Sequence, residues 1–443
     1  MILNTNNKFY FFLIFIILSA CSGTESSINF VKVHNGSFLL KGKPYYYFGA
    51  NFWHGAYLGA DLVKGDRERL CRELDLLAKH SITNLRVMAA SELSDLKMSV
   101  KPAFMDSVNM YNEQLLKGMD VLLDEMNKRN MKAVLVLNNY WQWSGGMTQY
   151  INWVHGDKII DPDKTGNWTG YQFQAARFYA DKKSNEIYRN YIRAIVNRRN
   201  TVNNKIYKQD PTIMSWQLAN EPRPAPDANN NSNSYDEFVT WMHETAKFIK
   251  EIAPNQLLST GNEGVNGCRE NSELYIDAHN SSYIDYLTFH IWPKNWSWYD
   301  ATNPDSTFDQ ALQKTMAYFG EHVYLARRLN KPTVLEEFGL ERDGGNYTSE
   351  SSTEFRDKYL ATLFKAIIDS AGNNSPMAGL NFWAWGGEAI ANHHDYIWRP
   401  GDSFMGDPPQ EPQGLNSVFS SDISTLEVFK TYNAELEKLL INK

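Results

Sequence analysis

Cysteine is scarce in this sequence, with three residues in a chain of 443. Three cysteines cannot staple a chain of this length, which excludes a disulfide scaffold. None belongs to a Cys-x-x-Cys pair or lies near a histidine cluster, which argues against a thiolate metal site. Cys71 and Cys268 could pair in an oxidising compartment, but we expect two buried, unreactive thiols.

Positive charge is also in short supply. The chain has 44 Lys and Arg against 51 Asp and Glu, a formal net charge of −7. Because binding a phosphate backbone needs a concentrated basic face, nucleic acid is excluded as a partner. Hydrophobic residues make up 43% and charged residues 21%, which indicates a globular protein rather than a disordered one.

Long apolar runs are missing except at the N-terminus. Residues 9–18 are apolar and follow a single charge, Lys8. A membrane-spanning helix takes about 20 residues, so this run is too short to be one. It is typical of a secretory signal peptide, which we place at residues 1–20.

The end of that segment predicts a lipid anchor. Leu18-Ser19-Ala20-Cys21 is similar to a bacterial lipobox, in which Cys21 becomes the lipidated first residue and residues 22–28 continue a tether that begins at residue 21. The alternative is an ordinary cleaved signal with an unrelated cysteine. The sequence therefore predicts an exported, membrane-anchored lipoprotein, at the cell surface or in the periplasm.

Eight short apolar runs recur along the rest of the chain, separated by stretches with helical spacing of apolar residues. The runs are residues 45–51, 83–88, 133–138, 213–218, 257–260, 284–290, 333–337 and 380–383. Most are unbroken rather than alternating, as expected of strands buried on both faces of a parallel sheet. The fifth run has no convincing long helix after it.

This alternation predicts an α/β fold, a (β/α)8 TIM barrel with long βα loops, over residues 29–443 as a single catalytic domain. An N-terminal β-hairpin turning at Asn35-Gly36 precedes it. The alternative is an open doubly wound sheet, which favours a glycine-rich phosphate loop that this sequence lacks. The surplus length falls after the third, sixth and eighth strands, on the face where barrel enzymes carry their active sites.

Polar residues follow the apolar runs where packing does not explain them. They are Asn51, Arg86, Asn138, Asn139, Asn220, Glu221, Glu263, His290, Glu336 and Glu337. Several carboxylates with an Arg and a His suit cleavage of a glycosidic bond, which needs one ionised and one protonated carboxyl group. No serine elbow, cysteine nucleophile or His-Glu-x-x-His pattern competes.

Tryptophan is the abundant residue, with 13 in the chain. Trp216 and Trp241 have core positions. Eleven fall at strand ends or in the loops that follow: Trp53, Trp141, Trp143, Trp153, Trp168, Trp292, Trp296, Trp298, Trp383, Trp385 and Trp398. A flat indole packs against the face of a pyranose, so this series predicts a cleft for a sugar chain, although half of the eleven could instead brace the loops.

Several segments resemble glycoside hydrolase family 5. Ser-Trp-Gln-Leu-Ala-Asn-Glu-Pro at 215–222 resembles its acid/base signature, and Leu-Glu-Glu-Phe-Gly at 335–339 its nucleophile strand. Residues 138–146, 260–264, 290–293 and 413–419 are similar to its β-mannanase subfamily. The likeness runs from about residue 30 to the C-terminus.

The resemblance implies roles for individual residues. Glu221 is the implied acid/base and Glu337 the implied nucleophile. The implied substrate-binding residues are Arg86, Asn139, Trp141, Asn220, Glu263, His290, Trp292 and Trp383. Trp292 stands where the family has a Tyr that contacts the nucleophile. Adjacent strand residues face opposite sides, so we expect Glu336 to point away from the lumen.

The implied reaction is a double displacement that cleaves internal β-1,4-mannosidic bonds of mannan, glucomannan or galactomannan with retention. It predicts carboxyl groups ~5–5.5 Å apart, with the pKa of Glu221 raised by the charge of Glu337. It implies no cofactor and no metal, and we expect a monomer. A His393-His394-Asp395 run is better explained by loop bracing or substrate contact than by metal binding.

Two other functions stay open at this point. An endo-β-1,4-glucanase on the same scaffold differs by how side chains meet the 2-hydroxyl of the sugar. A surface lipoprotein that binds glycan without cleaving it belongs to a different class. The presence of both Glu221 and Glu337 argues against the second.

Overall fold

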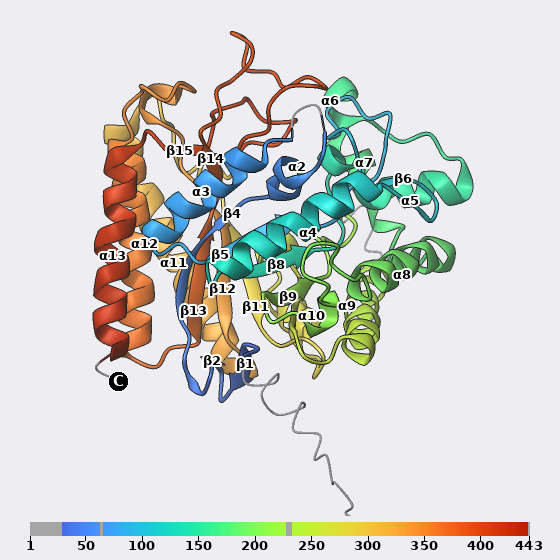
Figure 1. Ribbon diagram of the computed structural model, residues 1–443, viewed down its shortest axis with the longest axis horizontal. Coiled ribbons are helices and arrows are strands. Elements are labelled where there is room, and N and C mark those ends of the chain that lie inside the picture. The colour runs from blue at the N-terminus through green and yellow to red at the C-terminus, as the bar shows by residue number, and fades with distance from the viewer. Residues whose placement is uncertain (1–28, 63–64, 227–232, 442–443) are drawn as a thin grey trace, which may run out of the picture.

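The computed structural model describes residues 29–62, 65–226 and 233–441 (Figure 1). The predicted signal peptide, Cys21 and the tether up to residue 28 lie outside these residues. Among the helices that the structure describes, none is both long and apolar enough to cross a bilayer.

Eight parallel strands form the centre of the molecule, in the order β10-β9-β8-β5-β4-β13-β12-β11. They are β4 (Tyr47–Asn51), β5 (Asn84–Met88), β8 (Lys132–Val136), β9 (Ile213–Gln217), β10 (Leu257–Ser259), β11 (Leu287–Ile291), β12 (Thr333–Phe338) and β13 (Met377–Phe382). The two edges meet, since the backbone N–H of Asp285 donates to Leu258 and that of His290 to Glu263. The predicted (β/α)8 barrel is confirmed, with strand ends within three residues of the predicted ones.

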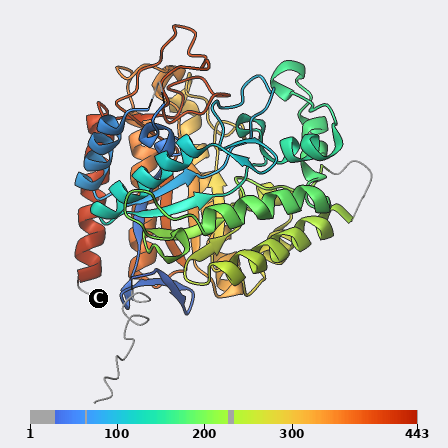
Figure 2. The same ribbon diagram turned by 45° about the vertical axis from the view of Figure 1, so that its right-hand side comes forward.

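Helices surround the barrel (Figures 1 and 2). The longer ones are α3 (Arg67–Lys79), α4 (Glu113–Lys128), α8 (Lys182–Val196), α9 (Asn233–Ile252), α11 (Pro304–Leu329), α12 (Glu354–Gly372) and α13 (Ile423–Ile441). Side chains of Asp66, Asn112 and Asp181 cap the first turns of α3, α4 and α8, which accounts for where these helices begin. The fifth strand is followed by a short 3-10 helix (Asn266–Cys268) and the eight-residue α10 (Ser272–His279), and by no long helix before β11, as the pattern indicated.

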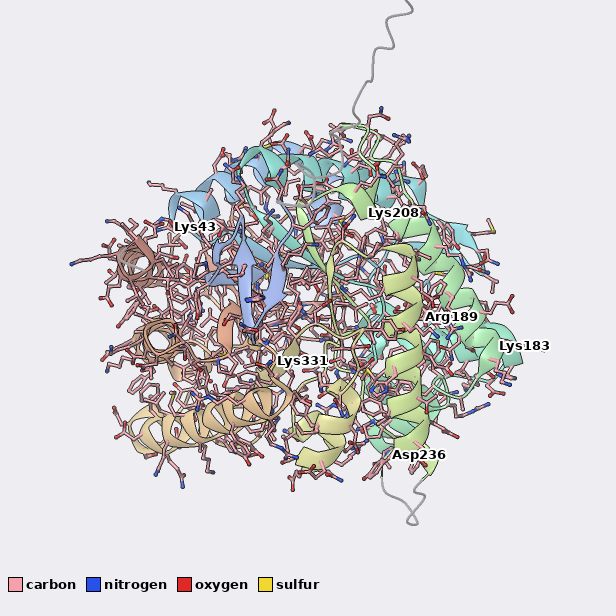
Figure 3. The ribbon with its side chains drawn as sticks, turned by 90° about the horizontal axis from the view of Figure 1, so that it is seen from below. Lys43, Lys183, Arg189, Lys208, Asp236 and Lys331 are labelled. Carbon is pink, nitrogen blue, oxygen red and sulfur yellow. The ribbon has the colours of Figure 1, made fainter. Side chains whose placement is uncertain are left out.

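The N-terminal hairpin covers one end of the barrel. Strands β1 (Lys32–His34) and β2 (Ser37–Leu40) pair across the predicted Asn35-Gly36 turn, and β3 (Lys43–Pro44) adds a third strand. Val31 and Phe38 pack there against residues from the starts of the barrel strands. Figure 3 looks at this end, with Lys43 of the hairpin labelled. The site must therefore lie at the other end, where the strands finish.

Long connections gather at the opposite end, above the barrel in Figure 2. The connection after β8 contains α5 (Gly146–His155), α6 (Pro162–Thr165) and α7 (Trp168–Ala176). Long segments also follow β11 and β13, as predicted. The chain after β5 adds a small hairpin, β6 (Met105–Ser107) and β7 (Met110–Tyr111), which the sequence pattern did not indicate.

Both described cysteines are free thiols. Cys268 is buried, and burial raises its pKa to about 12. Cys71 on α3 is only partly buried, so the prediction of two buried thiols was wrong for this residue. An amphipathic helix leaves its flanking positions half exposed, which explains the difference.

Candidate active site

A cavity of about 590 Å³ opens at the C-terminal ends of the barrel strands. Six of the eleven loop tryptophans line it: Trp141, Trp143, Trp168, Trp292, Trp296 and Trp383. The other five brace loops. The indole N–H of Trp53, for example, donates to the carbonyl of Gly406 at 2.8 Å, and that of Trp385 to Glu73 at 3.1 Å. About half of the eleven tryptophans were predicted to line the cleft and half to brace loops, which is close to what the structure has. Trp216 and Trp241 are buried core residues, as expected.

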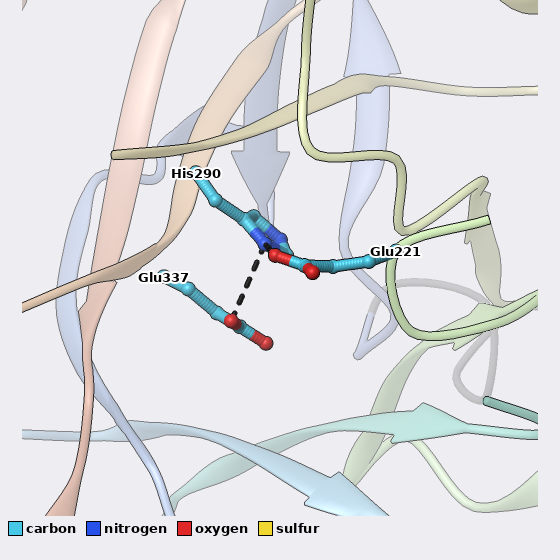
Figure 4. A group of neighbouring side chains, drawn as sticks. All are labelled: Glu221, His290 and Glu337. Atoms are coloured by element: carbon cyan, nitrogen blue, oxygen red, sulfur yellow. Dashed lines mark hydrogen bonds and ion pairs between the residues drawn. The ribbon is translucent and has the colours of Figure 1, made fainter. Parts of the chain in front are cut away.

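Two carboxylates and a histidine meet at the floor of this cavity (Figure 4). Glu221 follows β9, His290 lies on β11 and Glu337 on β12. His290 Nδ1 lies 2.7 Å from Glu221 Oε1 and 3.3 Å from Glu337 Oε2. A carboxylate oxygen of Glu221 and one of Glu337 lie within 4.8 Å of each other. This spacing fits a retaining pair and is shorter than the ~6.5–9.5 Å of an inverting pair.

The backbone at Glu221 is unusual. Its φ is +48°, in the left-handed region that residues with a Cβ rarely adopt. The backbone N–H of Glu221 donates to Gly261 and that of Asn220 to Asn138, so bonds to the neighbouring strands hold this conformation. Such strain in a buried, well-braced position is typical of functional sites.

Glu336 points into the lumen, contrary to the prediction. Phe289 pairs with Leu335 and the next residue, His290, pairs with Glu337, so Glu336 is the extra residue of a β-bulge. A bulge breaks the alternation of side chains, and consecutive residues can then face the same side. Glu336 Oε2 accepts a 2.5 Å hydrogen bond from Gln217 and lies 3.7 Å from Arg86.

Arg86 on β5 links the residues of this floor. Its guanidinium donates to Glu337, to Asn51 at 3.0 Å, to Gln217 at 2.8 Å and to Asn220 at 2.8 Å. The positive charge is therefore fixed beside Glu337 by four partners. An arginine in such a cage cannot rotate away, which keeps a cation next to that carboxylate.

Asn139 lies below the cavity rather than in its wall. The residue is fully buried, and its side-chain oxygen accepts from Asn220 Nδ2 at 3.2 Å and from the backbone N–H of Trp141 at 3.0 Å. Asn139 thus fixes two residues that do line the cavity.

Trp141 and Arg223 both approach Oε2 of Glu221. Trp141 Nε1 donates to Glu221 Oε2 at 2.5 Å. The guanidinium of Arg223 lies 4.9 Å from the Trp141 ring centroid and 3.9 Å from Glu221, and pairs closely with Glu263. Sequence reasoning missed Arg223, although it stands two positions after Glu221.

These donors lower the pKa of Glu221. Burial acts to raise it, but the hydrogen bond and charge of His290, the charge of Arg223 and the Trp141 bond bring the pKa to about 2. The prediction that the charge of Glu337 raises the pKa of Glu221 was wrong for the open cleft. Two hydrogen-bond donors and a nearby cation around one carboxylate outweigh a single nearby anion.

The pKa values of Glu337 and His290 shift in opposite directions, and that of Glu337 is contrary to the expectation of an ionised nucleophile. Burial raises the pKa of Glu337 well above its usual range against the pull of Arg86, and the charge of Glu221 adds to the rise. Burial lowers the pKa of His290 to about 4, so the ring is neutral near pH 7. We assign its proton to Nδ1, because both neighbours of that nitrogen are carboxylate oxygens. Two carboxyl groups this close titrate as a pair.

The far side of the cavity is closed by Trp383 and the loop after β13. Trp383 and Trp292 pack edge to face with ring centroids 6.0 Å apart. Trp383 Nε1 lies 3.4 Å from Glu411, whose pKa burial raises to about 8. Glu411 lines the cavity and was not predicted, although the motif at 413–419 begins two residues later. Within the described residues, no hydrogen bond joins Trp292 to Glu337.

Metal binding has limited support in this geometry. Glu221, His290 and Glu337 are the three-residue group in the described chain whose donor atoms come close enough to hold an ion. Arg86 already forms an ion pair with one oxygen of Glu337, and its positive charge would repel a metal cation bound there. Two residues of the His393-His394-Asp395 run form ion pairs with other residues of the same loop: His393 pairs with Asp402 and Asp395 with Arg399.

Known proteins resemble this chain over nearly its whole length. Residues 28–441 match the family described as GH family 5 beta-mannosidase-like. Mannan endo-1,4-beta-mannosidase 7 of Arabidopsis thaliana is 28% identical over 402 residues, covering 87% of this chain and 85% of the relative. Mannan endo-1,4-beta-mannosidase 4 of Solanum lycopersicum is 27% identical over 381 residues, covering 84% and 86%.

A solved structure is closer still. The glycoside hydrolase family 5 mannosidase of Rhizomucor miehei is 38% identical, with a TM-score of 0.86, and the match covers 94% of this chain and 100% of that one. An endo-1,4-beta-mannanase of the same fungus shares the fold, with a TM-score of 0.64 at 20% identity and coverage of 92% and 99%. The chain therefore belongs to the β-mannosidase-like group of glycoside hydrolase family 5.

Proposed function

We propose that this protein is a retaining glycoside hydrolase that cleaves internal β-1,4-mannosidic bonds in mannan, glucomannan or galactomannan. The observation that carries the proposal is the carboxylate pair of Glu221 and Glu337, with oxygens within 4.8 Å of each other on the floor of a tryptophan-lined cavity. The names of the plant relatives support mannan as the substrate class.

In the first step Glu337 attacks the anomeric carbon and the bond to the leaving oxygen breaks. Arg86 stabilises the ionised form of Glu337 before attack. Glu221 gives its proton to the leaving oxygen, and a covalent glycosyl-enzyme forms. In the second step Glu221 takes a proton from water, the resulting hydroxide attacks the same carbon, and Glu337 leaves, which returns the original configuration.

In the open cleft the proton of the pair lies on Glu337, whereas the first step needs it on Glu221. The donors around Glu221 favour its ionised form when no substrate is bound. A glycosidic oxygen that replaces the Trp141 N–H beside Glu221 is an acceptor, so the carboxyl must then donate to it. Substrate binding therefore moves the proton of the pair to Glu221. His290 Nδ1, close to both carboxylates, continues to serve whichever one is ionised.

Removal of a terminal sugar is a second candidate action. Gln410, Glu411 and Pro412 of the loop after β13 line the cavity beside Trp383. A wall there limits how many sugars fit beyond the reacting one. The solved relative with 38% identity is named a mannosidase, not a mannanase.

One set of assays separates these possibilities. Purified protein is incubated with linear mannan, carboxymethylcellulose and mannohexaose, and products are followed by chromatography and by NMR of the anomeric proton. Release of mixed oligosaccharides from mannan with an initial β-anomer supports the proposal, whereas release of mannose alone supports terminal cleavage. A faster reaction with carboxymethylcellulose would instead identify a glucanase.

The same assays test the non-catalytic alternative. Glu337→Ala is expected to lose activity by at least a thousandfold while still binding mannohexaose. If wild type and Glu337→Ala are equally inactive on every β-mannan and both bind it, the protein is a glycan-binding lipoprotein.

We further propose that the protein is anchored to a membrane by a lipid on Cys21 and acts as a monomer. The lipobox-like sequence supports the anchor. In a bacterial host, labelled fatty acid should be incorporated into wild type and into Cys71→Ser but not into Cys21→Ser. Incorporation into Cys21→Ser would refute the assignment. Size-exclusion chromatography with light scattering tests the monomer.

A further inference from the structure

A second cavity, of about 730 Å³, lies beside the cleft. Its walls come from residues 93–96, in the segment after β5, and from residues 149–167, in the segment after β8. Both segments leave the C-terminal ends of barrel strands, the end at which the catalytic pair lies. The volume falls in the range of sites that enclose small ligands, ~300–1,000 Å³.

The lining of this cavity suits a neutral, hydroxyl-rich ligand. Amides and hydroxyls come from Ser94, Gln149, Asn152, Thr165 and Asn167, and apolar side chains from Leu93, Leu96, Ile159 and Ile160. Sugar hydroxyls bond to the former and sugar C–H faces pack on the latter. The charged lining residues are two lysines and two aspartates, so they add no net charge that would select an ion.

The cavity continues the cleft on the leaving-group side. Glu221, which protonates the leaving oxygen in the proposed mechanism, is bonded to Trp141. The ring of Trp168 packs edge to face on Trp141 with centroids 6.1 Å apart, and Trp168 is 41% exposed. Trp168 lines the cleft, and its neighbour Asn167 lines the second cavity.

The wall between the two spaces is fixed. Gln142 of the cleft wall donates to both carboxylate oxygens of Asp163, at 3.1 and 3.3 Å. Asp161, two residues earlier, caps α6 and also accepts the backbone N–H of Lys97 at 2.8 Å. This rigid segment holds Trp168 at the border, with a sugar platform on one side and a polar pocket beyond it.

We propose that this second cavity binds the leaving-group end of a long β-mannan chain, several sugars away from the bond that is cleaved. The inference rests on the proposed function, because the direction of the chain follows from the role of Glu221. In this role the cavity determines how strongly the enzyme prefers long substrates over short ones, and it takes no part in bond cleavage.

Filling the cavity tests this. Leu93 is 40% exposed at its rim, so Leu93→Trp adds bulk without opening the core. Val202→Trp is the matched control, because Val202 is 51% exposed in the loop between α8 and β9, at the other end of the barrel. Gln149→Leu is a second variant that removes a lining amide and keeps the volume. The readout is kcat/KM for mannohexaose and for mannotriose, with melting temperatures to verify folding.

We expect Leu93→Trp and Gln149→Leu to lower kcat/KM for mannohexaose about fivefold, the equivalent of one or two lost hydrogen bonds. The value for mannotriose should stay unchanged, and Val202→Trp should change neither. Equal effects on both substrates, or no effect on mannohexaose, would overturn the inference while leaving the proposed function intact. A wild type that cleaves neither substrate would overturn the proposed function and the inference with it.

Discussion

Replacing Trp141 by Phe removes one hydrogen bond from the proposed catalytic pair and leaves an aromatic ring. The bond joins Trp141 Nε1 to Glu221 Oε2 at 2.5 Å, at the floor of the cavity. Phe keeps a flat ring in the same place but has no donor. The substitution therefore changes the electrostatics of Glu221 far more than it changes the shape of the cleft.

The size and sign of the effect follow from the structure. A hydrogen bond to a charged group contributes about 1.5–3 kcal/mol, and one pKa unit corresponds to about 1.4 kcal/mol. The bond stabilises ionised Glu221, so its loss raises the pKa of Glu221, the first group of the pair to lose its proton, by about one unit. The remaining proton of the pair lies on Glu337 and is not affected. The acid limb of kcat/KM should therefore move to higher pH by about one unit in Trp141→Phe.

The assay is the pH profile of kcat/KM on mannohexaose, which reports the ionisations of the free enzyme. Trp143→Phe is the control, because Trp143 also lines the cavity but its indole N–H has no bond to Glu221 among the described contacts. An acid limb that stays in place in Trp141→Phe, or moves equally in Trp143→Phe, would refute the reasoning.

Three further predictions concern stability. Burial raises the pKa of Glu92 from 4.5 to about 7, so the stability that its protonated form contributes is complete below pH 4.5 and is lost as the pH rises through 7. Between pH 4.5 and 8, the free energy of unfolding of Glu92→Gln, measured in urea, should rise by about 3 kcal/mol relative to that of wild type, and no rise would contradict the shift. Gly387→Ala should lower the melting temperature, because φ is +59° and the new Cβ would lie 2.1 Å from the Glu73 carboxylate, whereas Gly372→Ala meets nothing within 4 Å and should raise it slightly. Asp422→Asn should cost about 3–5 kcal/mol in urea unfolding, because it weakens ion pairs to two buried arginines, and a loss below 1 kcal/mol would count against it.

The barrel could be predicted because strands buried on both faces have a distinct sequence pattern. Every residue from Tyr47 to Asn51 and from Asn84 to Met88 is buried. All eight strands pair in parallel, so their sequences show no alternation between a buried and an exposed face. The hairpin at Asn35-Gly36 was equally visible, since the turn needs positive φ at both residues, and both have it. The strand ends then indicated Arg86, Glu221 and Glu337.

Residues whose position depends on loop geometry could not be predicted in this way. Glu411 lies in a stretch without periodicity, where Asp407 accepts hydrogen bonds from the backbone N–H groups of Gly414, Asn416 and Ser417. That folded loop brings Glu411 to Trp383. Long-range bonds of this kind leave no local signal in the sequence, and the same holds for the cavity between the segments after β5 and β8.

The bulge at Glu336 shows why an alternation rule fails next to Glu337, the proposed nucleophile. Alternation would leave Glu337 alone in the lumen, whereas the extra residue places two carboxyl groups beside Arg86. One guanidinium cannot neutralise both. Burial raises the pKa of Glu336 to about 7, so below that pH Glu336 is neutral and the charge of Arg86 acts on Glu337 alone. The bulge therefore couples the ionisation of Glu337 to that of a second carboxyl group, and how strongly Arg86 stabilises ionised Glu337 depends on the pH.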